Sequence, residues 1–221
     1  MSYLSTCDTC RLIWLAATLS YHIAYLVLSP VYLCACIKGC NTVLMMQKTD
    51  DTESFDRTWN EFKNGFGVVS GDYWLGNEQI HQLTTGSNDG KYKLRVDVVA
   101  KDPGAPQHYS HWAEFSTFRV GNEASNYQLT VSGYSGNAGD LMGPYSGMQF
   151  SAKNNDNDPN GPENCATRQK GGFWFDEYCG SGTCILTGGG EAYGNTLFYC
   201  ETVPPPSLDL VSVEMWLVCK T

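Results

Sequence analysis

The chain has 221 residues, of which 42% are hydrophobic and 13% are aromatic, and its net charge is −9. This length is enough to bury a sizeable core, and this composition argues against a disordered chain. The negative charge and the absence of clustered Lys and Arg argue against a nucleic-acid-binding role, because contacts to phosphates need clustered basic residues.

The N-terminal part of the chain contains a long uncharged stretch. Residues 12–37, LIWLAATLSYHIAYLVLSPVYLCACI, include no Asp, Glu, Lys or Arg. A stretch of this length can span a bilayer or form a long signal peptide, and a buried core helix is a further alternative. We therefore predict a leader over residues 1–11 and a signal or membrane-anchor segment over residues 12–37. The remainder of the chain is then extracellular, and any membrane contact is expected only through residues 12–37.

The ten cysteines lie in two groups, within residues 7–40 and within residues 165–219. Cys7 and Cys10 form a CxxC pair, but no second CxxC or HxxxH motif completes a zinc-binding set. We therefore expect disulfides, which are typical of extracellular proteins, rather than zinc.

TVLMM, directly after the first cysteine group, is predicted as a short buried strand, and a helix is expected next. Ser54 is the expected N-cap of this helix. Phe55, Trp59 and Phe62 share one helix face at positions i, i+4 and i+7. Gly65 is expected to end the helix.

Further along, the chain alternates predicted short strands with Gly and Asn turns. In YKLRVDVVA, residues 92–100, apolar residues at 94, 96 and 98 alternate with charged ones, which is typical of a strand with one buried face. The other expected strands are residues 111–121, 126–136, 148–151 and 207–218. Regular structure thins out from Lys153 onward, and the VPPP at residues 203–206 excludes a central strand there.

Several segments of the sequence follow one another in a characteristic order and with characteristic spacing. They are residues 55–67, 73–84, 92–98, 115–129, 133–140 and 147–175. In series they resemble the fibrinogen-related domain, which is the C-terminal globe of fibrinogen chains, ficolins, tachylectins, angiopoietins and tenascins. The resemblance implies an α+β fold with a short twisted antiparallel sheet and few helices. It places the domain at residues 39–219, with a loop-rich calcium- and ligand-binding subdomain at about residues 147–205. The two ends depart from the family pattern, most of all where the apolar stretch replaces the first cysteine pair.

Residues 154–165, NNDNDPNGPENC, form an oxygen-rich stretch in the last of these segments. Ca²⁺ takes about six to eight oxygen ligands from carboxylates, backbone carbonyls and water. Asp156 and Asp158 are two residues apart, so in a turn both carboxylates can face one ion. An EF-hand is excluded, because Thr167 occupies the place of its bidentate Glu. From the residues alone, a solvated turn remains the alternative.

The family resemblance favours the calcium site. It implies that Asp156 and Asp158 are the carboxylate ligands of a Ca²⁺ ion. It also implies two backbone carbonyl ligands, which are either Asn160 with Pro162 or Gly161 with Glu163.

The resemblance further implies a disulfide between Cys165 and Cys179 and a ligand pocket beside it. The implied pocket residues are Phe175, Asp176, Tyr178, Cys179 and Gly180, with Tyr193 as a further aromatic face. The aromatic run at residues 173–175 fits either a pocket wall or the core. Lectin members of the family carry a His where this chain has Gly180, so acetyl specificity is not implied. The carboxylates of Asp176 and Glu177 suit a basic peptide or an amine instead.

The sequence contains no nucleophile elbow, phosphate-binding loop or HExxH motif, so we predict that the chain is not an enzyme. The expected function is extracellular calcium-dependent recognition, with lectin-like binding of glycans or acetylated groups in innate pattern recognition. The alternative is a protein-binding domain of cell adhesion, matrix or receptor signalling, whose partner is a cell-surface protein. An oligomer stays open as an alternative, although the sequence shows no collagen-like or coiled-coil stalk.

Overall fold

The computed structural model describes residues 34–36, 40–49, 52–101, 107–180, 184–188, 199–200, 203 and 209–220. Of the predicted apolar segment 12–37, only residues 34–36 lie within these ranges, and there they form a strand. The predicted pocket residue Tyr193 lies outside the described residues. No helix in the described ranges combines the length and the apolar composition that a bilayer span requires.

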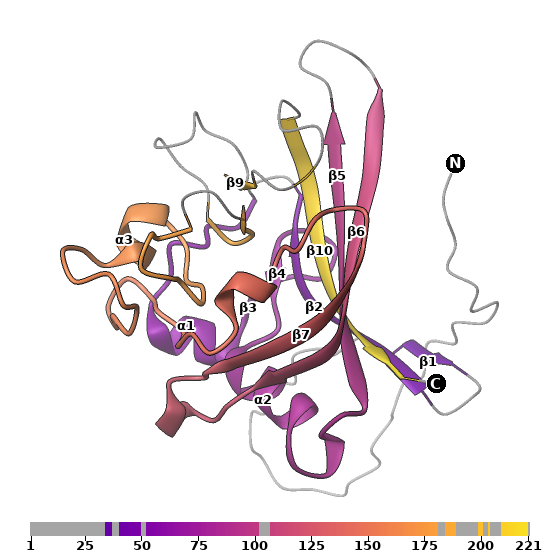
Figure 1. Cartoon of the computed structure of the whole chain (residues 1–221), viewed down its shortest axis with the longest axis horizontal. Helices are drawn as coiled ribbons and strands as arrows, with labels where there is room; N and C mark the ends of the chain where they lie inside the picture. The colour runs from indigo at the N-terminus through magenta and orange to yellow at the C-terminus, as the bar shows by residue number, and fades with distance from the viewer. Residues whose placement is uncertain are drawn as a thin grey trace, which may run out of the picture.

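The main sheet is antiparallel, as predicted, and runs in the order β3-β4-β2-β10-β5-β6-β7, with β1 paired to β2 (Figure 1). Its strands are β1 (Cys34–Cys36), β2 (Cys40–Lys48), β3 (Phe66–Gly67), β4 (Tyr73–Trp74), β5 (Tyr92–Lys101), β6 (His108–Val120), β7 (Leu129–Gly136) and β10 (Asp209–Cys219). A second, two-stranded sheet joins β8 (Cys184–Ile185) to β9 (Tyr199–Cys200). Strands β5 and β6 form a long hairpin, and β6 is longer than the short strand expected from the sequence.

Within the described residues, three short α-helices accompany the sheet, which confirms the predicted α+β architecture with few helices. They are α1 (Trp59–Asn64), α2 (Asn77–Thr84) and α3 (Cys165–Gln169). The described ranges also contain the 3₁₀ turns η1 (Gly86–Asn88), η2 (Glu123–Ser125) and η3 (Gly143–Tyr145). In Figure 1, α1 and α3 lie with the loops to the left of the twisted sheet.

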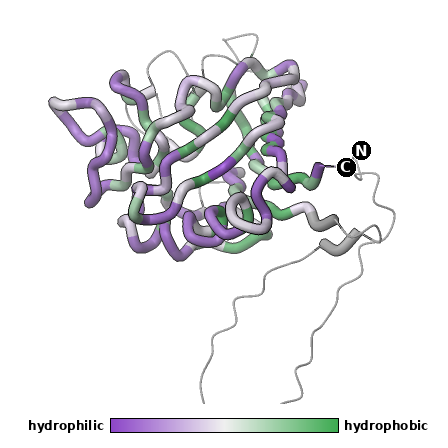
Figure 2. The backbone as a smooth tube through the Cα atoms, turned by 60° about the horizontal axis from the view of Figure 1, so that its bottom comes forward, coloured by the Kyte–Doolittle hydropathy of each residue, from purple (hydrophilic) through white to green (hydrophobic). Residues whose placement is uncertain are grey.

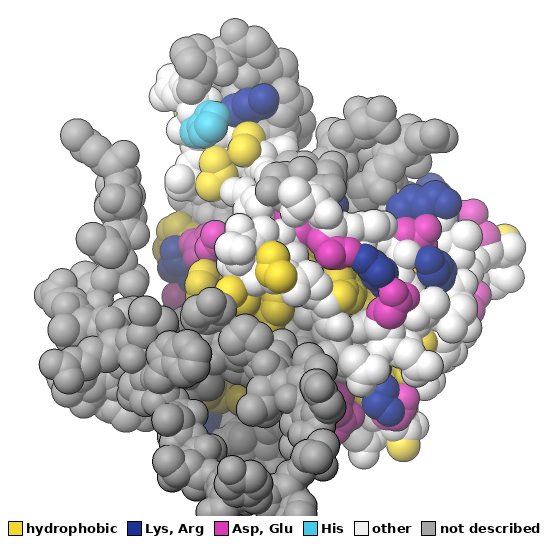
Figure 3. Space-filling view, turned by 180° about the vertical axis from the view of Figure 1, so that it is seen from behind, with side chains coloured by type: hydrophobic (Ala, Val, Ile, Leu, Met, Phe, Trp, Pro, Cys, Tyr) yellow, Lys and Arg dark blue, Asp and Glu magenta, His cyan; other side chains and the backbone are white. Residues whose placement is uncertain are grey.

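The alternating pattern of β5 places one side of the strand in the core, as expected. Leu94, Val96 and Val98 are completely buried, whereas the charged residues between them are partly exposed. Figure 2 shows the same change between hydrophobic and hydrophilic residues along the strands, while the outer loops are mainly hydrophilic. Seen from behind, acidic and basic side chains lie side by side rather than in a basic patch (Figure 3).

Aromatic rings fill the core between the sheet and the loops. Phe150 packs against Phe62 and Trp174, each at a centroid distance of 5.1 Å, and against Trp74 at 6.0 Å. The indole N–H of Trp74 donates to the carbonyl of Phe62, and that of Trp174 donates to the carbonyl of Tyr127. Their polar atoms are thus paired inside the core, as buried indoles require.

Two predicted elements differ from the structure. The predicted N-cap Ser54 lies in a separate turn, where its Oγ accepts the N–H of Asp56 at 3.2 Å, and Thr58 is the N-cap of α1. The predicted strand at residues 148–151 is absent, and only Ser151 forms an isolated bridge, with Phe173. The carbonyl of Met148 instead accepts the N–H of Leu129, the first residue of β7.

Candidate calcium and ligand site

Asparagine side chains fix the path of the oxygen-rich loop. Asn157 donates from Nδ2 to the carbonyl of Phe150 at 2.8 Å, and its backbone N–H donates to the hydroxyl of Ser151 at 2.9 Å. Asn164 is the N-cap of α3, where its Oδ1 accepts the N–H of Thr167. These side chains therefore satisfy backbone groups and hold the loop in one shape.

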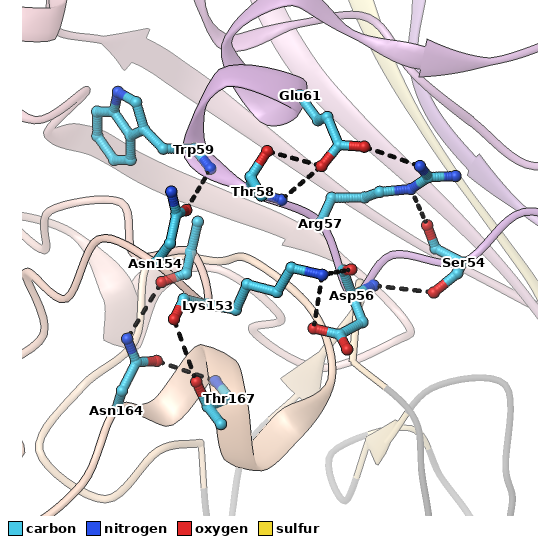
Figure 4. Close-up of polar contacts among 11 residues, drawn as sticks. Ser54, Asp56, Arg57, Thr58, Trp59, Glu61, Lys153, Asn154, Asn164 and Thr167 are labelled. Atoms are coloured by element: carbon cyan, nitrogen blue, oxygen red, sulfur yellow. Dashed lines mark hydrogen bonds and ion pairs between the residues drawn. The ribbon is translucent and has the colours of Figure 1, made fainter.

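The loop is also attached to α1, which lies far away in the sequence (Figure 4). Oδ1 of Asn154 accepts the N–H of Trp59 at 2.7 Å, across 95 residues. Nζ of Lys153 donates to the carbonyl of Asp56 at 2.6 Å. Sequence patterns do not reveal this remote cap, because capping patterns are recognised only between neighbouring residues.

Asp156 and Asp158, the predicted carboxylate ligands, lie next to each other in the loop. Oδ1 of Asp156 accepts the backbone N–H of Asp158 at 3.4 Å. The two carboxylate oxygens of Asp158 accept the N–H groups of Asn160 and Cys165 at 3.1 and 3.0 Å. Burial and the neighbouring Asp156 carboxylate raise the pKa of Asp158 to about 6, against the effect of the Cys165 N–H.

This pair fits a divalent cation, because two close carboxylates disfavour each other's charged form unless a positive charge lies between them. Within the described residues, no three His, Cys, Asp or Glu side chains gather as a metal-binding group. The other ligands of a Ca²⁺ ion bound here would therefore be backbone carbonyls and water, which Ca²⁺ accepts. The side chain of Asn160 is already engaged, since its Nδ2 donates to the carbonyl of Glu177 and its Oδ1 accepts the N–H of Glu163.

A disulfide joins the loop to the next turn. Cys165 and Cys179 are bonded, with their Cα atoms 5.1 Å apart, and both are completely buried. Cys184 and Cys219 each take part in a disulfide as well. Oxidised cysteines of this kind are typical of proteins outside the cytosol.

Residues 176–180 form a tight turn, which we call the acidic turn, organised by the carboxylate of Asp176. Its Oδ1 accepts the N–H groups of Gly180 at 2.8 Å and of Tyr178 at 3.2 Å. The carbonyl of Cys179, a residue with a φ of 53°, accepts a hydrogen bond from the buried side chain of Gln169 at 2.6 Å. The turn is thus held from both sides.

The acidic turn presents an aromatic side chain to solvent. Tyr178 is 62% exposed, and the adjacent Glu177 carboxylate raises the pKa of its hydroxyl. Asp176 and Glu177 directly precede Tyr178 in the sequence, so an exposed aromatic surface is combined with negative charge.

The surroundings of Gly180 and the burial of Phe175 do not fit a lectin-like pocket. A Cβ at Gly180 would lie 2.1 Å from Cδ1 of Ile185, so a His does not fit there without displacement of Ile185. Phe173, Trp174 and Phe175 are completely buried. They therefore belong to the core, and Phe175 offers no surface to a ligand.

Comparisons with known proteins identify a family with the same sequence pattern and fold. The family model described as "Fibrinogen beta and gamma chains, C-terminal globular domain" matches residues 30–196. The fibrinogen-like globe domain of human ANGPTL2 superposes with a TM-score of 0.65 and 31% identity, covering 83% of this chain and 81% of that chain.

Two curated relatives are similar over a part of their length. Fibrinogen-like protein 1 of Rattus norvegicus is 34% identical over 157 residues, which are 65% of this chain and 47% of that protein. Angiopoietin-related protein 7 of Mus musculus is 37% identical over 139 residues, which are 62% of this chain and 38% of that protein. The aligned part of the chain thus spans less than half of each of these relatives.

Proposed function

The chain belongs to the family of the C-terminal globular domains of fibrinogen beta and gamma chains, and we propose that it is an extracellular, calcium-stabilised domain that binds basic segments of other proteins. The family consists of non-enzymatic binding domains, so the prediction that the chain is not an enzyme is confirmed. The observation that carries the ligand proposal is the exposed Tyr178 beside two carboxylates on the acidic turn.

An aromatic ring next to carboxylates suits a cationic side chain. Lys and Arg are attracted both to the face of an aromatic ring and to carboxylates. The turn is held by hydrogen bonds to Asp176 and by the disulfide of Cys179, so little conformational entropy is lost when a ligand binds. By contrast, Gly180 offers no side chain that would hydrogen-bond an acetyl group. A protein ligand at a cell surface or in the matrix is therefore better supported than a glycan.

Calcium would act as a structural ion in this proposal. Domains of this family commonly bind calcium, and Asp156 and Asp158 would supply the carboxylates here. The ion would neutralise the pair and hold the loop that the disulfide connects to the acidic turn. It supplies no reaction chemistry.

A thermal-unfolding experiment tests the calcium site. Millimolar calcium is expected to raise the Tm of the wild-type protein relative to protein in EDTA, because a ligand that binds only the folded state stabilises it. Asp156→Asn and Asp158→Asn are expected to lose this shift. Asp89→Asn, at an exposed carboxylate paired with Arg119, is the matched control and should retain it. An equal calcium shift in all four proteins would refute the site.

An array that carries both basic peptides and glycans tests the ligand class. We expect binding to Lys- and Arg-rich peptides that weakens with salt, as ion pairs at a surface do. Tyr178→Ala and Glu177→Gln should weaken it, whereas Glu163→Gln, at an exposed carboxylate outside the turn, should not. Calcium-dependent binding to N-acetylated sugars, with no peptide signal, would support the lectin-like function instead. An array without any signal would refute both.

A further inference from the structure

The sequence contains two Asn-Gly dipeptides, Asn64–Gly65 and Asn160–Gly161. Asparagine before glycine is prone to lose its side-chain amide, because glycine has no Cβ to obstruct the approach of its backbone nitrogen. We propose that Asn160 is a site of spontaneous deamidation in the folded domain and that the fold protects Asn64. This inference requires neither calcium nor the proposed ligand.

The chemistry needs only water. The backbone nitrogen of Gly161 forms a bond to Cγ of Asn160, the Cγ–Nδ2 bond breaks, and ammonia leaves with the proton that the Gly161 nitrogen gives up. Water then opens the cyclic imide at either of its two carbonyls. The products are aspartate or isoaspartate at position 160, and no group is oxidised or reduced.

The backbone nitrogen that would attack Asn64 is engaged in a hydrogen bond, whereas the one that would attack Asn160 is accessible. The N–H of Gly65 donates to the carbonyl of Glu61 at 2.9 Å, at the C-terminal end of α1. In addition, Nδ2 of Asn64 donates to the carbonyl of Asn60 at 2.8 Å. Attack at Asn64 therefore requires the last turn of the helix to open.

Gly161 lies in the opposite environment. It is exposed, and apart from Gly161 itself and its two chain neighbours no atom of the described structure lies within 4 Å of the position that a Cβ would take. Its N–H has no hydrogen-bond partner in the part of the chain that the structure describes. Among the described residues, only the hydrogen bonds of the Asn160 side chain to the backbone of Glu163 and Glu177 restrain the reacting amide.

Deamidation would change the link between the oxygen-rich loop and the acidic turn. Nδ2 of Asn160 donates to the carbonyl of Glu177 at 3.0 Å. After the loss of ammonia, a carboxylate oxygen would face this carbonyl without a proton between them, which is repulsive. The new negative charge would also lie close to Asp158, which precedes it, and Glu163, which follows it, both within three residues. The reaction would therefore loosen the acidic turn with time.

Incubation of the whole folded chain at mildly alkaline pH, followed by peptide mapping with mass spectrometry, tests the proposal. We expect aspartate and isoaspartate to accumulate at position 160 at least about tenfold faster than at position 64, a difference of about 1.4 kcal/mol in activation free energy. Chain denatured in urea is the control, in which both dipeptides should react at comparable rates.

Two variants complete the experiment. Gly161→Ala fits the open space at this glycine and is expected to slow the reaction at position 160 without affecting position 64. Asn160→Asp imitates one product and should show faster amide hydrogen exchange across residues 176–180 than the wild-type protein. Equal rates at both sites in the folded chain, or reaction at Asn160 only after denaturation, would overturn the proposal. Unchanged exchange in Asn160→Asp would overturn its effect on the acidic turn.

Discussion

Asn154→Ala is expected to destabilise the domain by removing the distant acceptor that pairs the first backbone N–H of α1. Oδ1 of Asn154 accepts the N–H of Trp59 at 2.7 Å, and Trp59 is only 8% exposed, so little water can replace the lost acceptor. Loss of a helix cap costs about 0.5–2 kcal/mol, and an unpaired buried donor costs about 1–3 kcal/mol. The two ranges overlap at about 1–2 kcal/mol, which is the expected decrease in the free energy of unfolding.

Urea denaturation followed by tryptophan fluorescence measures this decrease. For a chain of this size, the corresponding loss in Tm is about 2–8 °C. Asn154→Asp retains an acceptor and places a negative charge at the helix N-terminus, so it should remain close to the wild-type stability. Asn155→Ala is the matched control, because the described structure gives the Asn155 side chain no hydrogen bond. The capping role is wrong if Asn154→Ala is as stable as Asn155→Ala, or if Asn154→Asp is as unstable as Asn154→Ala.

Three further predictions concern packing, pH and the disulfide. Gly172→Ala should lower the free energy of unfolding by about 1–3 kcal/mol, because its Cβ would lie 2.5 Å from a ring carbon of Phe62; unchanged urea stability would contradict this. In EDTA, the pKa of Asp158 is raised to about 6 in the folded state. Between its ordinary pKa and about pH 6, the folded state therefore holds a proton that the unfolded state has already released. Acidification from about pH 7 to about pH 5 should therefore stabilise the wild-type protein relative to Asp158→Asn. If the Tm values of the two proteins change with pH in parallel, Asp158 does not make this pH-dependent contribution. Replacement of both Cys165 and Cys179 by Ala should cost about 3 kcal/mol in denaturant unfolding, since a bond closing this 14-residue separation restricts the unfolded chain; a loss below about 1 kcal/mol would contradict that entropy model.

The elements that sequence patterns predicted well are those that depend on local periodicity. The alternation in β5 and the glycine at the end of α1 were predicted, because burial of one strand face and positive φ at a helix end are local requirements. Ser54 also matched a local capping pattern, but its hydroxyl accepts the N–H of Asp56 in a preceding turn, and Thr58, further along the chain, is the N-cap of the helix.

The candidate site depends on contacts between distant residues, so less of it could be predicted. The adjacent carboxylates of Asp156 and Asp158 were visible in the sequence, whereas the cap from Asn154 to Trp59 was not. The aromatic run at residues 173–175 fitted a pocket and a core equally well in the sequence, and only its burial in the folded chain decides for the core.

The position of β10 has a consequence for the order in which the molecule can be completed during synthesis. This strand lies between β2 and β5 in the sheet, although every other strand of that sheet precedes it in the sequence. Until residues 209–219 leave the ribosome, the facing edges of β2 and β5 have no partner strand between them, and unpaired edges promote association with other chains. Leu217 must then pair with Val43, so the sheet closes through one of the longest sequence separations in the chain. The nascent domain would therefore depend on folding assistance until its last strand is in place.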